Sequence, residues 1–494
     1  MKGDIKLNAR TLGQMPAGVN VPLYDRSSIK TGIVHIGIGS FHRSHQAYYT
    51  DQLLNNQEVT DWGICGVALL DSDRNMFNTF QAQDCLYTLM VTQQDGTLEA
   101  RIIGSITGCL FAPDNPEAVL NKMADPAVRI ITLTITEGGY NFDSATGEFL
   151  IGEPSIQWDL NNPETPRTVF GYLTQAIQRR KLQGLRGLTL QSCDNIQENG
   201  NILKKMLLSY VSAAQPDVAD WIEDEVSFPN SMVDQITPAT SLADIGKLRS
   251  LYGIADGCPV VCEPFIQWIV EDNYSVGRPG WESVGVQFVQ DVRPFEKMKI
   301  RLLNAGHSLL GFSGTLSGCK TIDETVRVPL IAKLLSKFMD EEVTPLLGNI
   351  EGINIGEYKK SLFQRFGNPN IKDQLTRICG ESSAKIPKFL LPTINENLER
   401  NGRISCGALV VASWCRCLEL DGTPGCDFAM QDQMIGALKE KAKASSEGDP
   451  LAFLKIEIIF GNLVSSRRFI DTYLPVIDSI HKQSIEKTIR DIVQ

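Results

Sequence analysis

Short apolar runs rich in β-branched residues recur along the first part of the chain, and stretches with helical periodicity separate them. Each run has the length and composition of a strand that is buried on both faces. The four clearest runs are residues 32–39, 62–70, 130–136 and 188–192. Residues 85–108 alternate like a pair of strands. Strands and helices that alternate on this scale predict an α/β fold with a mainly parallel, doubly wound sheet.

The pattern changes near residue 290, after which helical periodicity dominates to the end of the chain. The predicted helices are residues 294–312, 327–346, 355–366, 370–379, 391–400, 405–420, 430–444 and 467–493. Since 494 residues exceed what one typical core supports, two domains are expected. We predict an α/β domain with an extended N-terminal arm over residues 1–290 and a mainly α-helical domain over residues 291–494. No low-complexity linker separates them, so we expect two tightly packed halves with a cleft.

The first predicted helix of the second half carries three polar side chains in an apolar setting. Pro294 suits its first position, where the missing N–H needs no partner. Lys299, Asn304 and His307 project within an arc of roughly 140°, and Glu296 falls inside the same arc. A base, an amide and an imidazole directed at one point suit proton transfer and the recognition of an oxygen. The alternative is a buried helix with snorkelling cations and a hydrogen-bonded core histidine.

A glycine pair at the end of the first predicted strand indicates a nucleotide site. Gly37 and Gly39 precede a predicted helix, and glycines there let the backbone approach a pyrophosphate that faces the helix N-terminus. The third glycine of the dinucleotide fingerprint is absent, because His42 stands in its place. Asp71 and Asp73 follow the second strand, where an acid accepts hydrogen bonds from ribose hydroxyls and repels a 2′-phosphate. NAD is therefore favoured over NADP, although a plain strand–turn–helix with an acidic cap has the same residues.

Composition argues against several classes of function. The formal net charge is −11 and no Lys/Arg cluster forms a basic stripe, which argues against nucleic-acid or anionic-membrane partners. No apolar segment has the length of a signal-peptide core or a membrane span. The 12 cysteines lack zinc-ribbon or CxxC spacing, so we expect reduced thiols in the cytoplasm. The 5 histidines form no HExxH, and His42 and His45 have no acids beside them, so we expect no metal site.

Five motifs occur in order along the chain. They are Gly-x-Gly-x-Phe-His-Arg-x-His-Gln at residues 37–46, Thr-Ile-Thr-Glu-Gly-Gly-Tyr at 134–140, Ser-Cys-Asp-Asn at 192–195, Phe-Pro-Asn-Ser-Met-Val-Asp at 228–234 and Lys-x4-Asn-x2-His at 299–307. Together they resemble the mannitol dehydrogenase family of polyol-specific long-chain dehydrogenases/reductases. The resemblance covers nearly the whole chain, and residues 373–377, 383–385 and 386–389 look most like its mannitol 2-dehydrogenase branch.

The resemblance implies a Rossmann-type NAD-binding domain and a metal-independent interconversion of D-mannitol and D-fructose. It implies that Lys299 is the general base, and that Asn195 and Asn304 are the amides that hold the reacting oxygen as it gains alkoxide character. By the same resemblance, His307 binds and orients that oxygen. The residues that grip the other hydroxyls would be Asp234, Arg377 and Lys385. The cofactor residues would be Gly37, Gly39, Phe41, His42, Arg43, Asp73 and Glu137.

The chemistry of these side chains fits the implied roles. A lysine buried beside another cation or an apolar wall loses its proton more easily and becomes a base at modestly alkaline pH. Amide N–H groups stabilise a developing oxyanion without supplying a competing proton. We further hypothesise that Glu296, one turn before Lys299, connects the base to solvent. Glu296→Ala would then slow proton exchange more than hydride transfer, and an unchanged solvent isotope effect would contradict the hypothesis.

Several alternatives stay open at this point. Within the family they are a uronate reductase acting on fructuronate or tagaturonate, a D-arabinitol dehydrogenase and a D-sorbitol dehydrogenase. From another class, a non-catalytic NAD-binding sensor would keep the fold but has no need of Lys299. Ser72 stands where relatives often carry a second acid, so we expect the exclusion of NADP to be looser than usual. We expect a monomer that binds NAD and a polyol or ketose.

Overall fold

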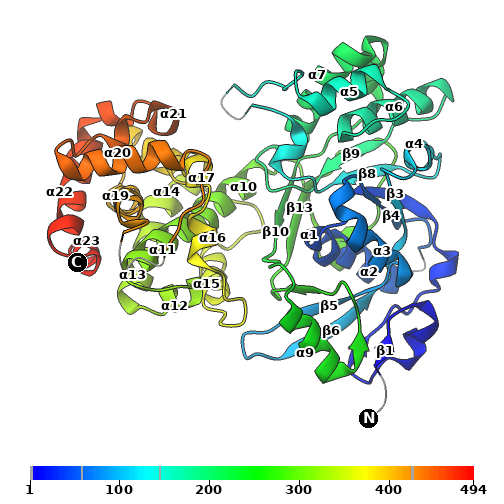
Figure 1. Cartoon of the computed structure of the whole chain (residues 1–494), viewed down its shortest axis with the longest axis horizontal. Helices are drawn as coiled ribbons and strands as arrows, with labels where there is room; N and C mark the ends of the chain where they lie inside the picture. The colour runs from blue at the N-terminus through cyan, green and yellow to red at the C-terminus, as the bar shows by residue number, and fades with distance from the viewer. Residues whose placement is uncertain (1–3, 57–58, 144–145, 424–427) are drawn as a thin grey trace. The chain divides into compact units, whose positions relative to one another are not determined.

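The structure is a computed structural model that describes residues 4–56, 59–143, 146–423 and 428–494 (Figure 1). The chain divides into two compact units, Met1–Arg293 and Pro294–Gln494.

A five-stranded parallel sheet organises the first unit, with strand order β7-β4-β3-β8-β9. The strands are β3 (Thr31–Ile36), β4 (Gly63–Ala68), β7 (Ile106–Phe111), β8 (Ile130–Leu133) and β9 (Thr189–Ser192). Neighbouring residues of β3 belong to different core clusters, because Val34 and Ile36 pack into one and Ile33 into the other. Side chains alternate across a strand, so the sheet is buried on both faces. The predicted doubly wound α/β fold is confirmed.

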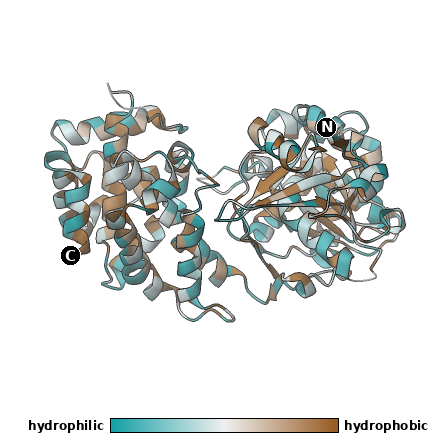
Figure 2. Ribbon diagram, turned by 90° about the horizontal axis from the view of Figure 1, so that it is seen from below, coloured by the Kyte–Doolittle hydropathy of each residue, from teal (hydrophilic) through white to brown (hydrophobic). Residues whose placement is uncertain are grey.

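Helices connect these strands and cover the sheet. They include α1 (Ser40–Ser44), α2 (Gln46–Asn56), α3 (Arg74–Ala82), α4 (Pro116–Met123), α5 (Pro154–Asn161), α6 (Val169–Leu182) and α7 (Asn199–Ala214). In Figure 2 the apolar residues of this unit concentrate on the strands at its centre, as their burial requires. Amphipathic helices pack their apolar sides on such a sheet.

Smaller sheets extend the first unit. The predicted strand pair is present as β5 (Tyr87–Thr92) and β6 (Leu98–Ile103), which are antiparallel. The N-terminal arm is tied down by two short strands, since β1 (Ile5–Lys6) pairs with β11 (Ile254–Ala255) and β2 (Val19–Asn20) pairs with β6. The remaining strands are β10 (Ser231–Asp234), β12 (Val260–Cys262), β13 (Gln267–Glu271) and β14 (Gln287–Val289). In sequence, helix α8 (Ala219–Glu225) precedes β10 and helix α9 (Leu242–Tyr252) follows it.

The second unit is helical, as predicted, and its described residues contain no strand. Its helices include α10 (Arg293–Lys299), α11 (Ala305–Leu316), α12 (Ile322–Val326), α13 (Pro329–Lys337), α14 (Thr344–Leu347), α15 (Ile355–Phe366), α16 (Leu375–Cys379), α17 (Ser382–Phe389), α18 (Leu391–Glu399), α19 (Ser405–Leu420), α20 (Ile435–Glu447), α21 (Glu457–Phe460), α22 (Arg467–Lys482) and α23 (Ile485–Val493). Helices α11 and α19 supply much of the core, with most of their residues buried. Among the described residues, no helix combines the length and apolarity needed to cross a bilayer.

Candidate active site

The turn after β3 requires glycine at one position and leaves open space at another. Gly37 has φ +97°, and a Cβ atom there would lie 2.1 Å from the carbonyl oxygen of Thr134. Gly39 is the N-cap of α1 with φ −76°, and a Cβ atom there would meet nothing closer than 4.0 Å. Gly37 therefore shapes the turn, while Gly39 leaves room through which a ligand can approach the backbone.

Two side chains, those of Thr134 and His35, form hydrogen bonds to the carbonyl oxygen of Gly37. The Oγ1 atom of Thr134 donates to Gly37 O at 2.8 Å, and His35 Nε2 lies 3.0 Å from the same oxygen. His35 Nδ1 lies 2.7 Å from Thr132 Oγ1. Burial lowers the pKa of His35 to about 3, so this ring is neutral. The hydrogen bonds hold the turn in one conformation.

The histidine in place of the third fingerprint glycine packs into the core. The rings of His42 and His35 stack with centroids 3.3 Å apart at 10°, and burial holds the pKa of His42 well below its usual range. Arg43 is also buried, and its Nη1 atom donates to Cys258 O at 2.5 Å. Phe41 stacks on His45 with centroids 5.0 Å apart. The side chains of His42 and Arg43 therefore support the turn, and their backbone is what they can offer a ligand.

Acidic residues follow the strands that flank β3. Asp73 ends the short 3-10 turn Asp71–Asp73 after β4, and its Oδ2 atom accepts a hydrogen bond from Leu70 N at 3.4 Å. Arg74 is paired with Asp114 at 2.8 Å. Glu137 begins the turn Glu137–Tyr140 after β8 and is exposed. Because parallel strands end at one edge, the structure brings Asp73 and Glu137 to the same edge as the glycine turn.

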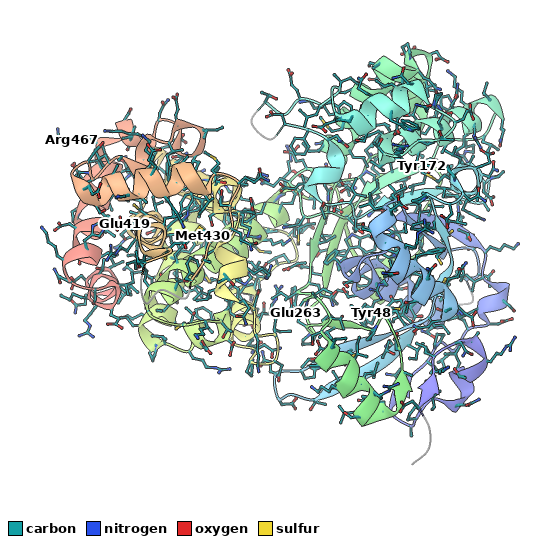
Figure 3. All side chains as sticks on the ribbon, in the orientation of Figure 1. Tyr48, Tyr172, Glu263, Glu419, Met430 and Arg467 are labelled. Carbon is teal, nitrogen blue, oxygen red and sulfur yellow. The ribbon has the colours of Figure 1, made fainter. Side chains whose placement is uncertain are left out.

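Asn195 and Asp234 belong to segments that hydrogen bonds connect. Asn195 is exposed and follows β9, while Asp234 is the buried last residue of β10. The side-chain amide of Asn199 donates to Asp194 O at 3.0 Å and to Ser231 O at 2.9 Å. Glu263, labelled in Figure 3, accepts from the backbone N–H of Ile236 at 2.6 Å and so holds the turn after Asp234.

The buried carboxylate of Asp194 fixes the loop after β8. It accepts hydrogen bonds from Ile135 N at 3.1 Å, Thr136 N at 2.9 Å and Tyr140 Oη at 2.8 Å. Burial raises the pKa of this carboxyl, which these three donors oppose. Thr136 has φ +60°, a conformation that the surrounding bonds must hold.

We predict that Asp194→Ala lowers the free energy of unfolding by about 3 kcal/mol, because the buried hydroxyl of Tyr140 and two part-buried backbone N–H groups lose their acceptor. Asp194→Asn keeps one acceptor oxygen and should cost about half as much. Urea unfolding of the three proteins measures both values. A loss below about 1 kcal/mol for the alanine variant would show that water replaces the carboxylate.

The helix that carries Lys299, Asn304 and His307 is not a continuous α-helix. A π-helical segment, η7 (Ile300–Asn304), lies between α10 and α11, and the N–H of Ala305 bonds to the carbonyl of Ile300 five residues earlier. Such π segments are single-residue insertions in α-helices and are frequent at functional sites. Helical periodicity predicted the helix but not this segment.

The π segment changes which residues share a face. In a continuous α-helix, Lys299 and Asn304 would be about 140° apart, at 100° per residue. The π segment absorbs one residue, so the two behave like residues four apart in an α-helix, about 40° apart. His307, three residues later, then falls roughly 20° to the other side of Lys299. The expected arc of 140° narrows to about 60°, and the structure brings the three side chains onto one face.

These side chains are largely buried. Lys299 is 6% exposed and Glu296 is 4% exposed. The Oδ1 atom of Asn304 is buried and meets no hydrogen-bond partner among the described residues, so a polar group of a ligand would satisfy it. The ring of His307 contacts Phe366, with centroids 4.7 Å apart. The face therefore offers an amine, an amide and an imidazole that are largely shielded from water.

Arg377 and Lys385 lie side by side on α16 and α17. Arg377 is bound by Asp373 through both Nε and Nη2, with 2.7 Å from Nε to Oδ1. Lys385 Nζ lies 3.3 Å from the carbonyl oxygens of Arg377 and Ile378. Burial, and then the charge of Arg377, lower the pKa of Lys385. Helix α16 packs closely on α11, because a Cβ atom at Gly311, one turn after His307, would lie 2.9 Å from Cys379 Sγ.

A glycine turn on a parallel sheet, followed in the same chain by a helix with a base, an amide and an imidazole, defines the class: a nucleotide-dependent dehydrogenase. Family models agree with this class. The model of the mannitol dehydrogenase Rossmann domain matches residues 31–283, and that of the mannitol dehydrogenase C-terminal domain matches residues 291–480. The chain belongs to the mannitol dehydrogenase family.

Individual relatives cover the whole length. A mannitol 2-dehydrogenase of Neosartorya fischeri is 45% identical over 98% of each chain. The ternary complex of Pseudomonas fluorescens mannitol 2-dehydrogenase with NAD and D-mannitol is 41% identical, with a TM-score of 0.88 over 99% of each chain. A substrate-free D-sorbitol dehydrogenase is 37% identical, with a TM-score of 0.91 over 98% of this chain and 100% of that one.

Proposed function

We propose that this chain oxidises D-mannitol to D-fructose with NAD and catalyses the reverse reduction, without a metal ion and with Lys299 as general base. The enzyme class is that of its relatives, polyol dehydrogenases, and the cofactor is NAD. The observation that carries the finer proposal is the single face formed by Lys299, Asn304 and His307 across the π segment. In the part of the chain that the structure describes, no group of three or more His, Cys, Asp or Glu is placed to hold a metal ion.

The residues of the first unit fit a dinucleotide. A pyrophosphate can approach the backbone at this turn, because Gly37 allows the turn and Gly39 leaves open space beside it. The carboxylate of Asp73 can accept hydrogen bonds from the hydroxyls of an adenosine ribose. When bound, NAD accepts a hydride from the carbon that bears the reacting hydroxyl. We assign Phe41, His42, Arg43 and Glu137 to the same site, with His42 and Arg43 acting through their backbone.

The proposed reaction moves one proton and one hydride. Lys299 Nζ takes the proton of the reacting hydroxyl as the carbon loses its hydride, so the oxygen passes through alkoxide character. Asn304 donates an amide N–H to that oxygen, Asn195 is assigned the second amide, and His307 orients the oxygen. In the reduction of the ketose, the lysine returns the proton. Lys299 thus acts as base in one direction and as acid in the other.

The geometry of Arg377 favours a neutral polyol over a uronate. Asp373 already pairs with one edge of its guanidinium, through Nε and Nη2, and its negative charge lies beside the remaining donors. A uronate carboxylate at the other edge would be repelled by Asp373, whereas neutral hydroxyls can accept hydrogen bonds from the remaining donors without that repulsion. Asp234, Arg377 and Lys385 are accordingly proposed to bind hydroxyls of the substrate.

A substrate panel tests the proposal. Absorbance of reduced nicotinamide is followed with D-mannitol, D-arabinitol, D-sorbitol and, in the reducing direction, D-fructose, fructuronate and tagaturonate, each with the NAD and NADP cofactor pairs. We expect the highest kcat/KM with D-mannitol and NAD, unchanged after treatment with a chelator. Preference for D-sorbitol would favour the activity named for the second structural relative. No turnover of any compound would favour a cofactor-binding sensor.

We predict that Gly37→Ala weakens NADH binding at least about tenfold, because the methyl group collides with Thr134 O and the turn must change shape. Gly39→Ala is the matched control: its backbone conformation suits alanine and the added methyl meets no protein atom within contact distance. Fluorescence titration with NADH gives both dissociation constants. Equal weakening by both substitutions would mean that the ligand, and not the turn, excludes the methyl group.

A further inference from the structure

Two thiols that take no part in the proposed reaction lie in contact within the first unit. The Sγ atoms of Cys85 and Cys109 are 3.4 Å apart. Cys85 follows α3 and is 5% exposed, while Cys109 lies in the edge strand β7 and is half-buried. A covalent bond between them requires the sulfurs to approach by little more than an ångström.

The surrounding backbone holds the two thiols together. The guanidinium of Arg26 donates to Asp84 O at 2.8 Å and to Ile106 O at 3.0 Å, so it links the residue before Cys85 to the start of β7. Asp84 and Cys85 have φ of +52° and +58°, a conformation that L-residues adopt only when neighbouring contacts hold it. The turn therefore directs Cys85 at β7.

The two sulfurs are not equivalent. Cys85 Sγ donates its hydrogen to Cys109 Sγ, and this bond lowers the pKa of Cys109. The same bond, together with burial, raises the pKa of Cys85. Cys109 is also the more accessible sulfur, so it is the better nucleophile, and Cys85 is placed to react second.

We propose that Cys85 and Cys109 form a redox-active dithiol that a hydroperoxide converts to an intramolecular disulfide. The Cys109 thiolate attacks one peroxide oxygen, the O–O bond breaks, and Cys109 becomes a sulfenic acid while a hydroxide leaves. The sulfur of Cys85 then attacks the sulfenic sulfur, the S–O bond breaks, and water leaves with the proton of Cys85. Two thiols lose two electrons and two protons, and hydrogen peroxide becomes two waters.

Helix α3 (Arg74–Ala82) connects Asp73 to the dithiol, because it begins next to Asp73 and ends three residues before Cys85. Helix α3 starts at Arg74, and Phe77 packs on Phe111 of β7 with ring centroids 5.2 Å apart. Drawing Cys85 toward β7 therefore pulls on the end of α3, whose start adjoins the acid assigned to the adenosine ribose. This consequence rests on the proposed function. We expect the disulfide to change the NADH dissociation constant about threefold.

Mass spectrometry tests the dithiol itself. The reduced protein is treated with one equivalent of hydrogen peroxide, and intact mass and peptide maps are recorded. We expect a loss of two hydrogens, a cross-link between the peptides containing Cys85 and Cys109, and recovery with dithiothreitol. In Cys85→Ser the sulfenic acid on Cys109 should persist or oxidise further, whereas Cys109→Ser should leave Cys85 unmodified. Cys319→Ser, at a half-buried thiol of the second unit, is the control that should still form the cross-link.

Other outcomes overturn the proposal or its consequence. A cross-link of Cys109 to the neighbouring Cys65, or no cross-link while Cys109 is oxidised irreversibly, overturns the dithiol. NADH titration of reduced and oxidised protein tests the consequence: an unchanged dissociation constant overturns the coupling to α3. A reduced protein that binds no NADH contradicts the proposed function but leaves the mass result unaffected, so the failures are distinguishable.

Discussion

Replacing Lys299 by alanine is expected to lower kcat for D-mannitol oxidation about a thousandfold near neutral pH, within the range that a positioned general base contributes. The NADH dissociation constant should stay within about twofold, because the residues proposed to bind the cofactor belong to the other unit. The reason for the loss is chemical: the variant lacks the proposed general base, which accepts the hydroxyl proton while the hydride leaves. Steady-state kinetics across pH measure the effect.

The same helix supplies a matched control. Lys297, two residues earlier, is 33% exposed at its side chain and pairs with Glu396 at 3.1 Å. Lys297→Ala makes the same chemical change as Lys299→Ala in the same helix. Lys297 does not share the face of Lys299 and Asn304, because residues two apart point about 200° from each other. The kcat and pH profile of Lys297→Ala should match the wild type. In Lys299→Ala the activity should rise steadily with pH and should increase when a small primary amine is added. Undiminished activity of Lys299→Ala at every pH would contradict the proposed mechanism.

Much of the fold follows from burial patterns that are visible in the chain. Runs such as residues 130–136 are apolar at consecutive positions because β8 is covered on both faces, and this pattern is strong wherever a parallel sheet is enclosed. The helices of the second unit were predicted for the same reason, since their apolar faces repeat at helical spacing. Two short helices were not predicted: α12 and α21 have too few residues to show a period.

The sites were harder to predict in detail, because side-chain packing decides them. His42 was predicted to bind a cofactor, and only the structure shows its ring stacked on His35 inside the core. The signal that could have shown this is His35, which lies in the buried strand β3. A buried imidazole needs polar or aromatic neighbours, and His42 is one of them. The hydrogen bonds of Asp194 connect residues far apart in sequence, so no local pattern reveals them. Neither did periodicity reveal the π segment, because α11 is buried on nearly all of its faces and has no polar stripe whose shift would mark an extra residue.

Inserting one alanine between Leu302 and Leu303 is expected to lower kcat at least about a hundredfold, because it rotates Asn304 and His307 by roughly 100° relative to Lys299. The π segment already absorbs one extra residue, and a second cannot be absorbed without breaking the ladder between α10 and α11. Deleting Arg301 is expected to have the smaller effect, with kcat within about tenfold of wild type, because Lys299 and Asn304 then become residues four apart in an α-helix on one face.

Arg301→Ala separates alignment from the loss of an ion pair. Arg301 Nη1 lies 2.5 Å from Glu396 Oε2, and the deletion removes this pair as well. If the deletion variant and Arg301→Ala have similar kcat values, the deletion changes kcat only through the loss of the ion pair between Arg301 and Glu396. Urea unfolding and NADH titration check that every variant is folded and binds cofactor. If insertion and deletion both leave a folded protein and both abolish turnover equally, alignment across the π segment is not what brings the base, the amide and the imidazole together. The geometry of this helix requires that the insertion variant have a far lower kcat than the deletion variant. It also requires that the deletion variant have a kcat close to that of Arg301→Ala.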